Sequence, residues 1–258
     1  MPPNSSGSPP SLACSGDVST PPRVDAEVAG ALVIAALVLT LIQYFGLANC
    51  FPGLFPGVWA ELPVFHLYAL LWWAGCTCVG YFLVPALWLK WRGRSLGDYG
   101  LRMPRRSKHL WVYPAMFLLM LGPLWWASGT EAFLATYPFY PYARVAPGLW
   151  LVFEASYALQ FLALEFFFRG FLVFSLHRRM GEAAILVSMV PYCMIHFLKP
   201  FPETLGAIVA GVVLGFLALR TGSVLGGVAL HWSVALTMDI LAIWRKGGLA
   251  PGVDWFGF

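Results

Sequence analysis

Four residues have side chains suited to hydrolysis and lie inside or at the edge of long apolar stretches. They are Glu165, Arg169, His196 and His231. An ionisable side chain at membrane depth is costly and typically marks a functional site. Peptide hydrolysis requires a water, a base that activates it and donors for the oxyanion. A carboxylate, a guanidinium and two imidazoles can supply these groups, so a buried proteolytic site is the leading hypothesis.

The spacing within this set suggests how its members cooperate. Glu165 and Arg169 are four residues apart and share one face of a helix. Arg169 would keep the carboxylate ionised, and a histidine could share the activation of water or donate to the oxyanion. The alternative is structural: an ion pair inside a helix bundle, with each histidine hydrogen-bonding between helices.

Two histidines and a glutamate can also hold zinc, as they do in soluble metalloproteases. The H-E-x-x-H signature of those enzymes is absent. No cofactor is therefore assigned. The sequence leaves binding of a divalent metal such as zinc as an alternative, without identifying its ligands.

The composition is that of a membrane protein. Of the 258 residues, 59% are hydrophobic and 11% are charged, whereas a soluble protein carries about 25% charged residues. We expect an all-α, polytopic membrane helix bundle with about seven transmembrane helices. The expected spans are 29–47, 63–90, 110–127, 148–176, 183–198, 203–220 and 223–244. Residues 1–28 are predicted to form a disordered N-terminal tail, and residues 29–258 a transmembrane helical domain.

The positive charges give an orientation. With the N-terminus in the cytosol, eleven Lys or Arg residues fall on the inner side and four on the outer side. The densest group, residues 90–108, is expected to face anionic lipid. The chain shows no basic and aromatic pattern that indicates nucleic-acid binding, so the expected partners are the bilayer and a membrane protein or peptide substrate.

Three of the candidate residues are expected at a similar depth in the membrane. Along their helices, Glu165 lies about 20 Å, His196 about 21 Å and His231 about 16 Å from the predicted cytosolic ends. Three residues on three helices therefore reach a similar level in the membrane.

Three segments resemble the motifs of a known family. Leu164 to Gly170 resembles E-E-x-x-x-R-G, Tyr192 to His196 resembles F-x-x-x-H, and His231 matches the histidine of H-x-x-x-N. These are motifs of the CAAX proteases and bacteriocin-processing enzymes, which include type II CAAX prenyl endopeptidases. The resemblance implies an intramembrane protease with a family-like core at about 110–244. It also suggests a bacterial inner-membrane location.

Two positions depart from these motifs. Leu164 replaces the first glutamate, to which the family assigns water activation, and Ala235 replaces the asparagine that helps to stabilise the oxyanion. Asp239 lies two turns beyond His231, too far along the helix for a simple substitute. The resemblance thus leaves two hypotheses. One is a CAAX-type endopeptidase in which a Glu/His-activated water cleaves the peptide. The other is a non-catalytic relative that binds a membrane peptide or scaffolds a partner protease.

Overall fold

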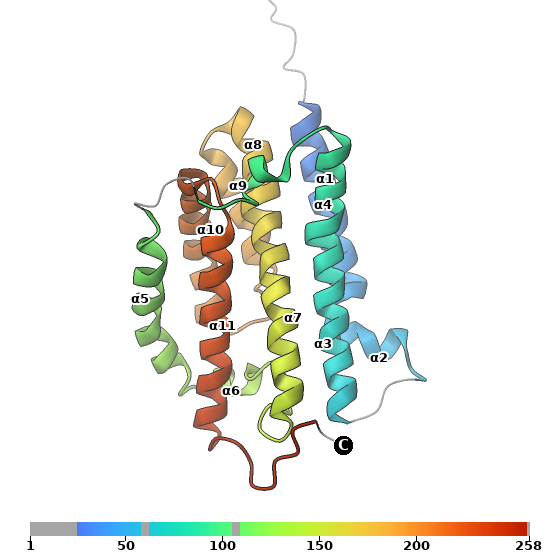
Figure 1. Ribbon diagram of the computed structural model, residues 1–258, viewed down its shortest axis with the longest axis vertical. Coiled ribbons are helices and arrows are strands. Elements are labelled where there is room, and N and C mark those ends of the chain that lie inside the picture. The colour runs from blue at the N-terminus through green and yellow to red at the C-terminus, as the bar shows by residue number, and fades with distance from the viewer. Residues whose placement is uncertain (1–24, 58–61, 105–108, 257–258) are drawn as a thin grey trace, which may run out of the picture.

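The protein is an all-α bundle, as predicted (Figure 1). The computed structural model describes residues 25–57, 62–104 and 109–256, and these contain helices and turns but no strand. The predicted N-terminal tail falls almost entirely on residues 1–24, outside the described residues. The first helix begins at Ala26, because Asp25 caps it by accepting a hydrogen bond from the Glu27 backbone N–H at 2.8 Å.

Seven helical columns and several short turns make up the described chain. The first two columns are α1 with η1 (Ala26–Leu41, Ile42–Gly46) and α3 with η3 and α4 (Pro63–Thr77, Cys78–Leu83, Val84–Trp91). They are followed by α5 (Val112–Ala127) and by α7 with η6 and α8 (Pro147–Glu165, Phe166–Leu172, Val173–Met180). The last three are α9 (Ala183–Met194), α10 (Phe201–Thr221) and α11 (Leu225–Arg245). The short elements are η2 (Ala48–Cys50), α2 (Phe51–Leu54), η4 (Leu96–Tyr99) and α6 (Glu131–Thr136).

Each predicted span overlaps one of these columns, but their lengths differ. Among the described residues, five columns are long and apolar enough to cross a membrane, whereas α5 and α9 are shorter, with 16 and 12 residues. The predicted span 183–198 is too long, because α9 ends at Met194. A residue that precedes proline disfavours the helical conformation, so Lys199 before Pro200 prevents α9 from continuing into α10. His196 therefore lies in a turn.

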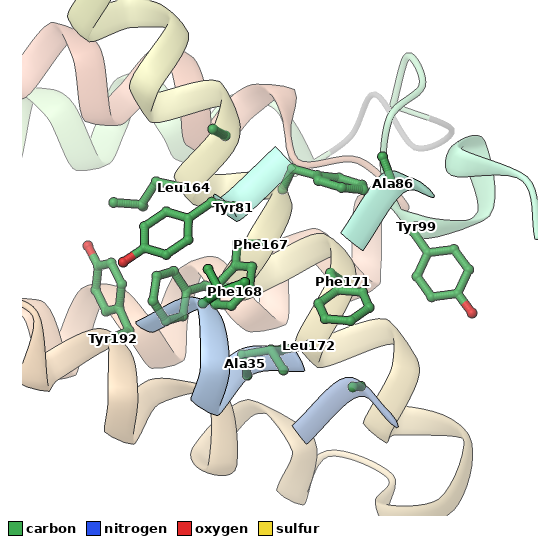
Figure 2. Close-up of a cluster of buried hydrophobic side chains, with 14 of the residues drawn as sticks. Ala35, Tyr81, Ala86, Tyr99, Leu164, Phe167, Phe168, Phe171, Leu172 and Tyr192 are labelled. Carbon is green, nitrogen blue, oxygen red and sulfur yellow. The ribbon is translucent and has the colours of Figure 1, made fainter. Parts of the chain in front are cut away.

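The column α7–η6–α8 is the centre of the bundle. In its most apolar stretch 83% of the residues are buried, compared with 22–39% in the corresponding stretches of the other four long columns. Figure 1 shows α7 between α3 and α11. Four phenylalanines that follow Glu165 are fully buried in one apolar cluster (Figure 2): Phe166, Phe167, Phe168 and Phe171. A helix that is apolar on all sides is enclosed by other helices, and this one carries Glu165 and Arg169.

Candidate functional site

The site begins where α7 changes into a π-helix. Glu165 is the last residue of α7, and η6, a π-helix that runs from Phe166 to Leu172, follows it and contains Arg169. Such π-helical segments inside α-helices occur frequently at functional sites. Arg169 Nη1 lies 3.2 Å from Glu165 Oε1, and the two side chains are 2% and 1% exposed. The ion pair expected from the spacing is therefore present and buried.

His231 of α11 is bound to the same carboxylate oxygen. Its Nδ1 lies 2.6 Å from Glu165 Oε1. An ionised carboxylate only accepts hydrogen bonds, so Nδ1 is the protonated nitrogen. The Phe161 ring stacks on the imidazole, with centroids 5.4 Å apart and planes 4° apart. The hydrogen bond and the stacked ring together fix the orientation of His231.

Gly227 allows α11 to come this close. It lies one turn before His231, and a Cβ at this position would be 2.4 Å from Glu165 Oε2. A real Cβ does not approach an oxygen so closely, so only glycine fits without a shift of the helix. The backbone of α11 thus covers the carboxylate oxygen that the other two partners do not use.

Tyr192 of α9 joins the remaining groups. Its hydroxyl lies 2.7 Å from His231 Nε2, and the Arg169 guanidinium lies 3.8 Å from the centre of its ring. Because His231 Nδ1 carries the proton, Nε2 accepts the hydrogen bond that Tyr192 donates. Arg169 Nη1 and Nη2 have no hydrogen-bond partner, so the ion pair and the ring face stabilise the cation. Sequence reasoning assigned Tyr192 no role. The available signal was a hydroxyl at a position where the motif has Phe.

His196 lies next to this group rather than within it. Its Nδ1 is 2.8 Å from the Tyr192 carbonyl oxygen, and its ring centroid is 4.8 Å from the Tyr192 ring. Thr204 Oγ1 donates to the His196 carbonyl at 2.6 Å and ties the turn to α10. The structure thus brings Arg169 and His231 into direct contact with Glu165 and connects His196 to this group through Tyr192.

The two departures from the motifs lie in apolar surroundings. Leu164 is 9% exposed and belongs to the apolar cluster around η6 that Figure 2 shows. Ala235 is 8% exposed and packs in a second cluster with Phe153 and Phe161. Glu165 points toward α11, where it binds His231. The place of the family's first glutamate is therefore filled by packing.

The same geometry speaks against a zinc site made from the candidate residues. Tyr192 is hydrogen-bonded to both imidazoles, and His231 Nδ1 is bound to Glu165 instead of facing an ion with it. In the part of the chain that the structure describes, no group of three or more His, Cys, Asp or Glu side chains is arranged to hold a metal ion. The candidate residues therefore do not fit a zinc ion.

A polar cluster in the most buried column of a helix bundle defines a membrane protein with an embedded polar site. Residues 146–237 match the family described as type II CAAX prenyl endopeptidase Rce1-like. The matched segment runs from the start of α7 into α11 and contains all four candidate residues, so the resemblance read from the motifs is confirmed. No curated protein and no solved structure matches the chain.

Proposed function

We propose that the chain is a membrane-embedded endopeptidase of the CAAX prenyl type, which hydrolyses a peptide bond near or in the bilayer. The observation that carries this proposal is the 2.6 Å hydrogen bond between His231 Nδ1 and Glu165 Oε1 in the core of the bundle. A carboxylate that orients an imidazole makes the far nitrogen the basic one. In the structure this nitrogen, Nε2, accepts a hydrogen bond from Tyr192, and a water must take that place before it can be activated. This pair is the means by which water is activated.

The environment of each side chain suggests a division of roles. Glu165 is 1% exposed and already binds Arg169 and His231, whereas the His231 side chain is 18% exposed. His231 Nε2 therefore takes the proton of the attacking water and returns it to the leaving amine. Glu165 fixes the tautomer and stabilises the imidazolium, and Arg169 keeps Glu165 ionised.

Ala235 replaces the asparagine that helps to stabilise the oxyanion in the family motif, and the Tyr192 hydroxyl can take over this role. Tyr192 bears the only hydroxyl that the chain adds to the F-x-x-x-H motif, and it lies 2.7 Å from His231 Nε2. When a water or substrate takes the place of this contact at Nε2, the hydroxyl is free to donate to the developing oxyanion. His196 Nδ1, which lies 2.8 Å from the Tyr192 carbonyl oxygen, helps to position the residue that carries this hydroxyl.

The test is cleavage of a panel of membrane peptides by the purified protein. Glu165→Gln and His231→Gln should each lower the rate about 10²-fold or more, because each removes part of the base. The control is Glu182→Gln, a change of the same type at an exposed position, which should leave the rate unchanged. Equal rates for wild type and His231→Gln would refute the proposed base.

The second candidate is a non-catalytic relative that binds a membrane peptide or scaffolds a partner protease. The apolar packing of Leu164 and Ala235 favours it. In that case wild type cleaves no peptide but retains one on pull-down, and Leu164→Glu with Ala235→Asn gains cleavage. A wild type that cleaves, with loss in Glu165→Gln, would exclude this candidate.

We also propose that residues 90–109 face the cytosol and that the protein lies in a bacterial inner membrane. The distribution of eleven and four positive charges supports the orientation. Ser95 is exposed in this segment. We expect Ser95→Cys, in a chain whose native cysteines are replaced by serine, to resist a membrane-impermeant thiol reagent in intact cells. Ready labelling from outside would reverse the orientation.

A further inference from the structure

A polar pocket lies at one end of the bundle, away from Glu165. Its volume is about 260 Å³, and it is lined by residues from the start of α1, the segment after α4 and the end of α8: Asp25, Glu27, Arg94, Ser175, Arg178 and Arg179. Ser175 is ten residues from Glu165, about 15 Å along the helix. The pocket is therefore separate from the proposed catalytic pair, and an inference about it does not rest on that function.

The two acids of the pocket are already engaged. Glu27 forms an ion pair with Arg94, accepts a hydrogen bond from Tyr99 at 2.5 Å and lies 3.8 Å from Arg178 Nη1. Figure 2 shows the Tyr99 hydroxyl pointing away from the phenylalanine cluster. Burial and the hydrogen bond to Glu27 raise the pKa of Tyr99 to about 12, so Tyr99 remains a donor.

Asp25 is held by Arg179, whose Nε lies 2.8 Å from Asp25 Oδ2. This hydrogen bond lowers the pKa of Asp25, which therefore stays ionised. Three arginines and two carboxylates line the pocket, so one positive charge is in excess. The pocket attracts an anion rather than a cation.

Two donors in the pocket have no acceptor. Ser175 Oγ is buried without a hydrogen-bond partner, and the whole residue is 1% exposed. Arg94 Nε is likewise buried and without a partner, although Arg94 Nη2 binds Glu27. A buried donor without an acceptor is costly. An anion with several acceptor oxygens would satisfy both donors and neutralise the excess positive charge.

We propose that this pocket binds a phosphate group, supplied by the headgroup of an anionic phospholipid. Arginine forks match the oxygens of phosphate, and serine adds a neutral donor. The pocket lies where α1 begins and α8 ends, at the level at which spans leave the bilayer and lipid phosphates lie. Nearby, Trp91 is 79% exposed at the end of α4, as is typical of residues at the membrane interface.

The test measures lipid binding to the purified full chain in neutral detergent by native mass spectrometry and thermal unfolding. Phosphatidylglycerol should bind and raise the unfolding temperature, whereas diacylglycerol, which lacks the phosphate, should not. Arg94→Gln should weaken phosphatidylglycerol binding about tenfold, and Ser175→Ala several-fold. Arg220→Gln removes the same charge from an exposed position outside the pocket, and it should bind lipid as wild type does.

Each outcome decides the proposal. Arg94→Gln also breaks the ion pair with Glu27, so Ser175→Ala, whose hydroxyl has no protein partner, serves as the second variant if Arg94→Gln does not fold. Equal binding by Ser175→Ala and wild type, or an equal loss in Arg220→Gln, would overturn the site. The last measurement adds inorganic phosphate instead of lipid. A shift with phosphate and none with phosphatidylglycerol would assign the pocket to a soluble phosphate compound and overturn the lipid.

Discussion

The helices α7 and α11 bury acids at two levels, and the two levels differ in their partners. At one level, the Glu165 carboxylate binds Arg169 and His231. About 16 Å away along α7, Glu154 lies beside Asp239 of α11, and both are almost fully buried. Asp239 accepts hydrogen bonds from Trp150 Nε1 and the Phe139 N–H, both at 3.2 Å. Neither carboxyl oxygen of Glu154 has a hydrogen-bond partner.

The difference shows that the neighbours, not the residue type, decide what a buried acid can do. Lys199, a cation that acts electrostatically on Asp239, is bound to Glu203 at 2.7 Å. A carboxyl buried without a cation is stable only as the neutral acid. Glu165, with a guanidinium and an imidazole, can stay charged in the same core. The first level therefore suits proton transfer, and the second suits structural support.

The largest effect is expected when the first level loses its cation. Arg169→Ala leaves Glu165 as a buried charge with one partner fewer. Breaking a buried pair from one side typically costs about 3–5 kcal/mol. We expect the free energy of unfolding in detergent to fall by that amount, as measured by denaturant titration, and cleavage to be lost.

The control is Arg220→Ala, which truncates an exposed arginine and should change stability by less than about 0.5 kcal/mol. If Arg169→Ala is as stable and as active as this control, the two levels do not differ in the way described.

A smaller effect is expected from one methyl group at Gly227. The Cβ of Gly227→Ala would meet Glu165 Oε2 at 2.4 Å, so α11 or the carboxylate must move. Overpacking of this kind costs about 1–3 kcal/mol. Because His231 moves with α11, the cleavage rate should fall more than the stability does, which kinetics and thermal unfolding together can measure.

Gly206→Ala is the matched control, since a Cβ at Gly206 of α10 meets nothing within 4 Å. It should be neutral or slightly stabilising. A similar result for both alanines would mean that α11 does not press on the carboxylate.

Removal of the Tyr192 hydroxyl should affect chemistry more than folding. Tyr192→Phe restores the residue of the family motif and keeps the ring under Arg169. The lost hydrogen bond costs about 0.5–1.5 kcal/mol of stability. If the hydroxyl is the oxyanion donor, kcat should fall about 10²-fold, with KM little changed. Tyr44→Phe removes a hydroxyl from a side chain that is 70% exposed and is the control. An unchanged kcat in Tyr192→Phe would show that this hydroxyl is not the oxyanion donor.

The smallest effect is expected at the second level. Glu154→Gln replaces a neutral acid by a neutral amide of the same shape, so the stability should change by less than about 1 kcal/mol. Glu165→Gln is the comparison, because it removes a charge on which Arg169 and His231 depend, and it should be clearly more destabilising. Equal losses in the two variants would show that Glu154 is ionised.

The sequence by itself determined the helical columns and the candidate residues of the site. Apolar stretches of sufficient length predicted the helical columns, because the bilayer and the bundle core both select for them. The spacing of Glu165 and Arg169 predicted their ion pair, because residues four apart meet on one helix. The motifs with His196 and His231 indicated the family.

Only the tertiary structure decided which atoms meet. Contacts between α7, α9 and α11 depend on how closely the helices pack, and this closeness depends on Gly227, which no helical pattern marks. The tertiary structure put His231 on Glu165 and Tyr192 on His231, and it ended α9 before His196. It also gave Glu165 and Glu154, two buried acids on one helix, different partners. A sequence records residue types along a chain, whereas the charge that a buried acid can hold depends on its partners from other helices.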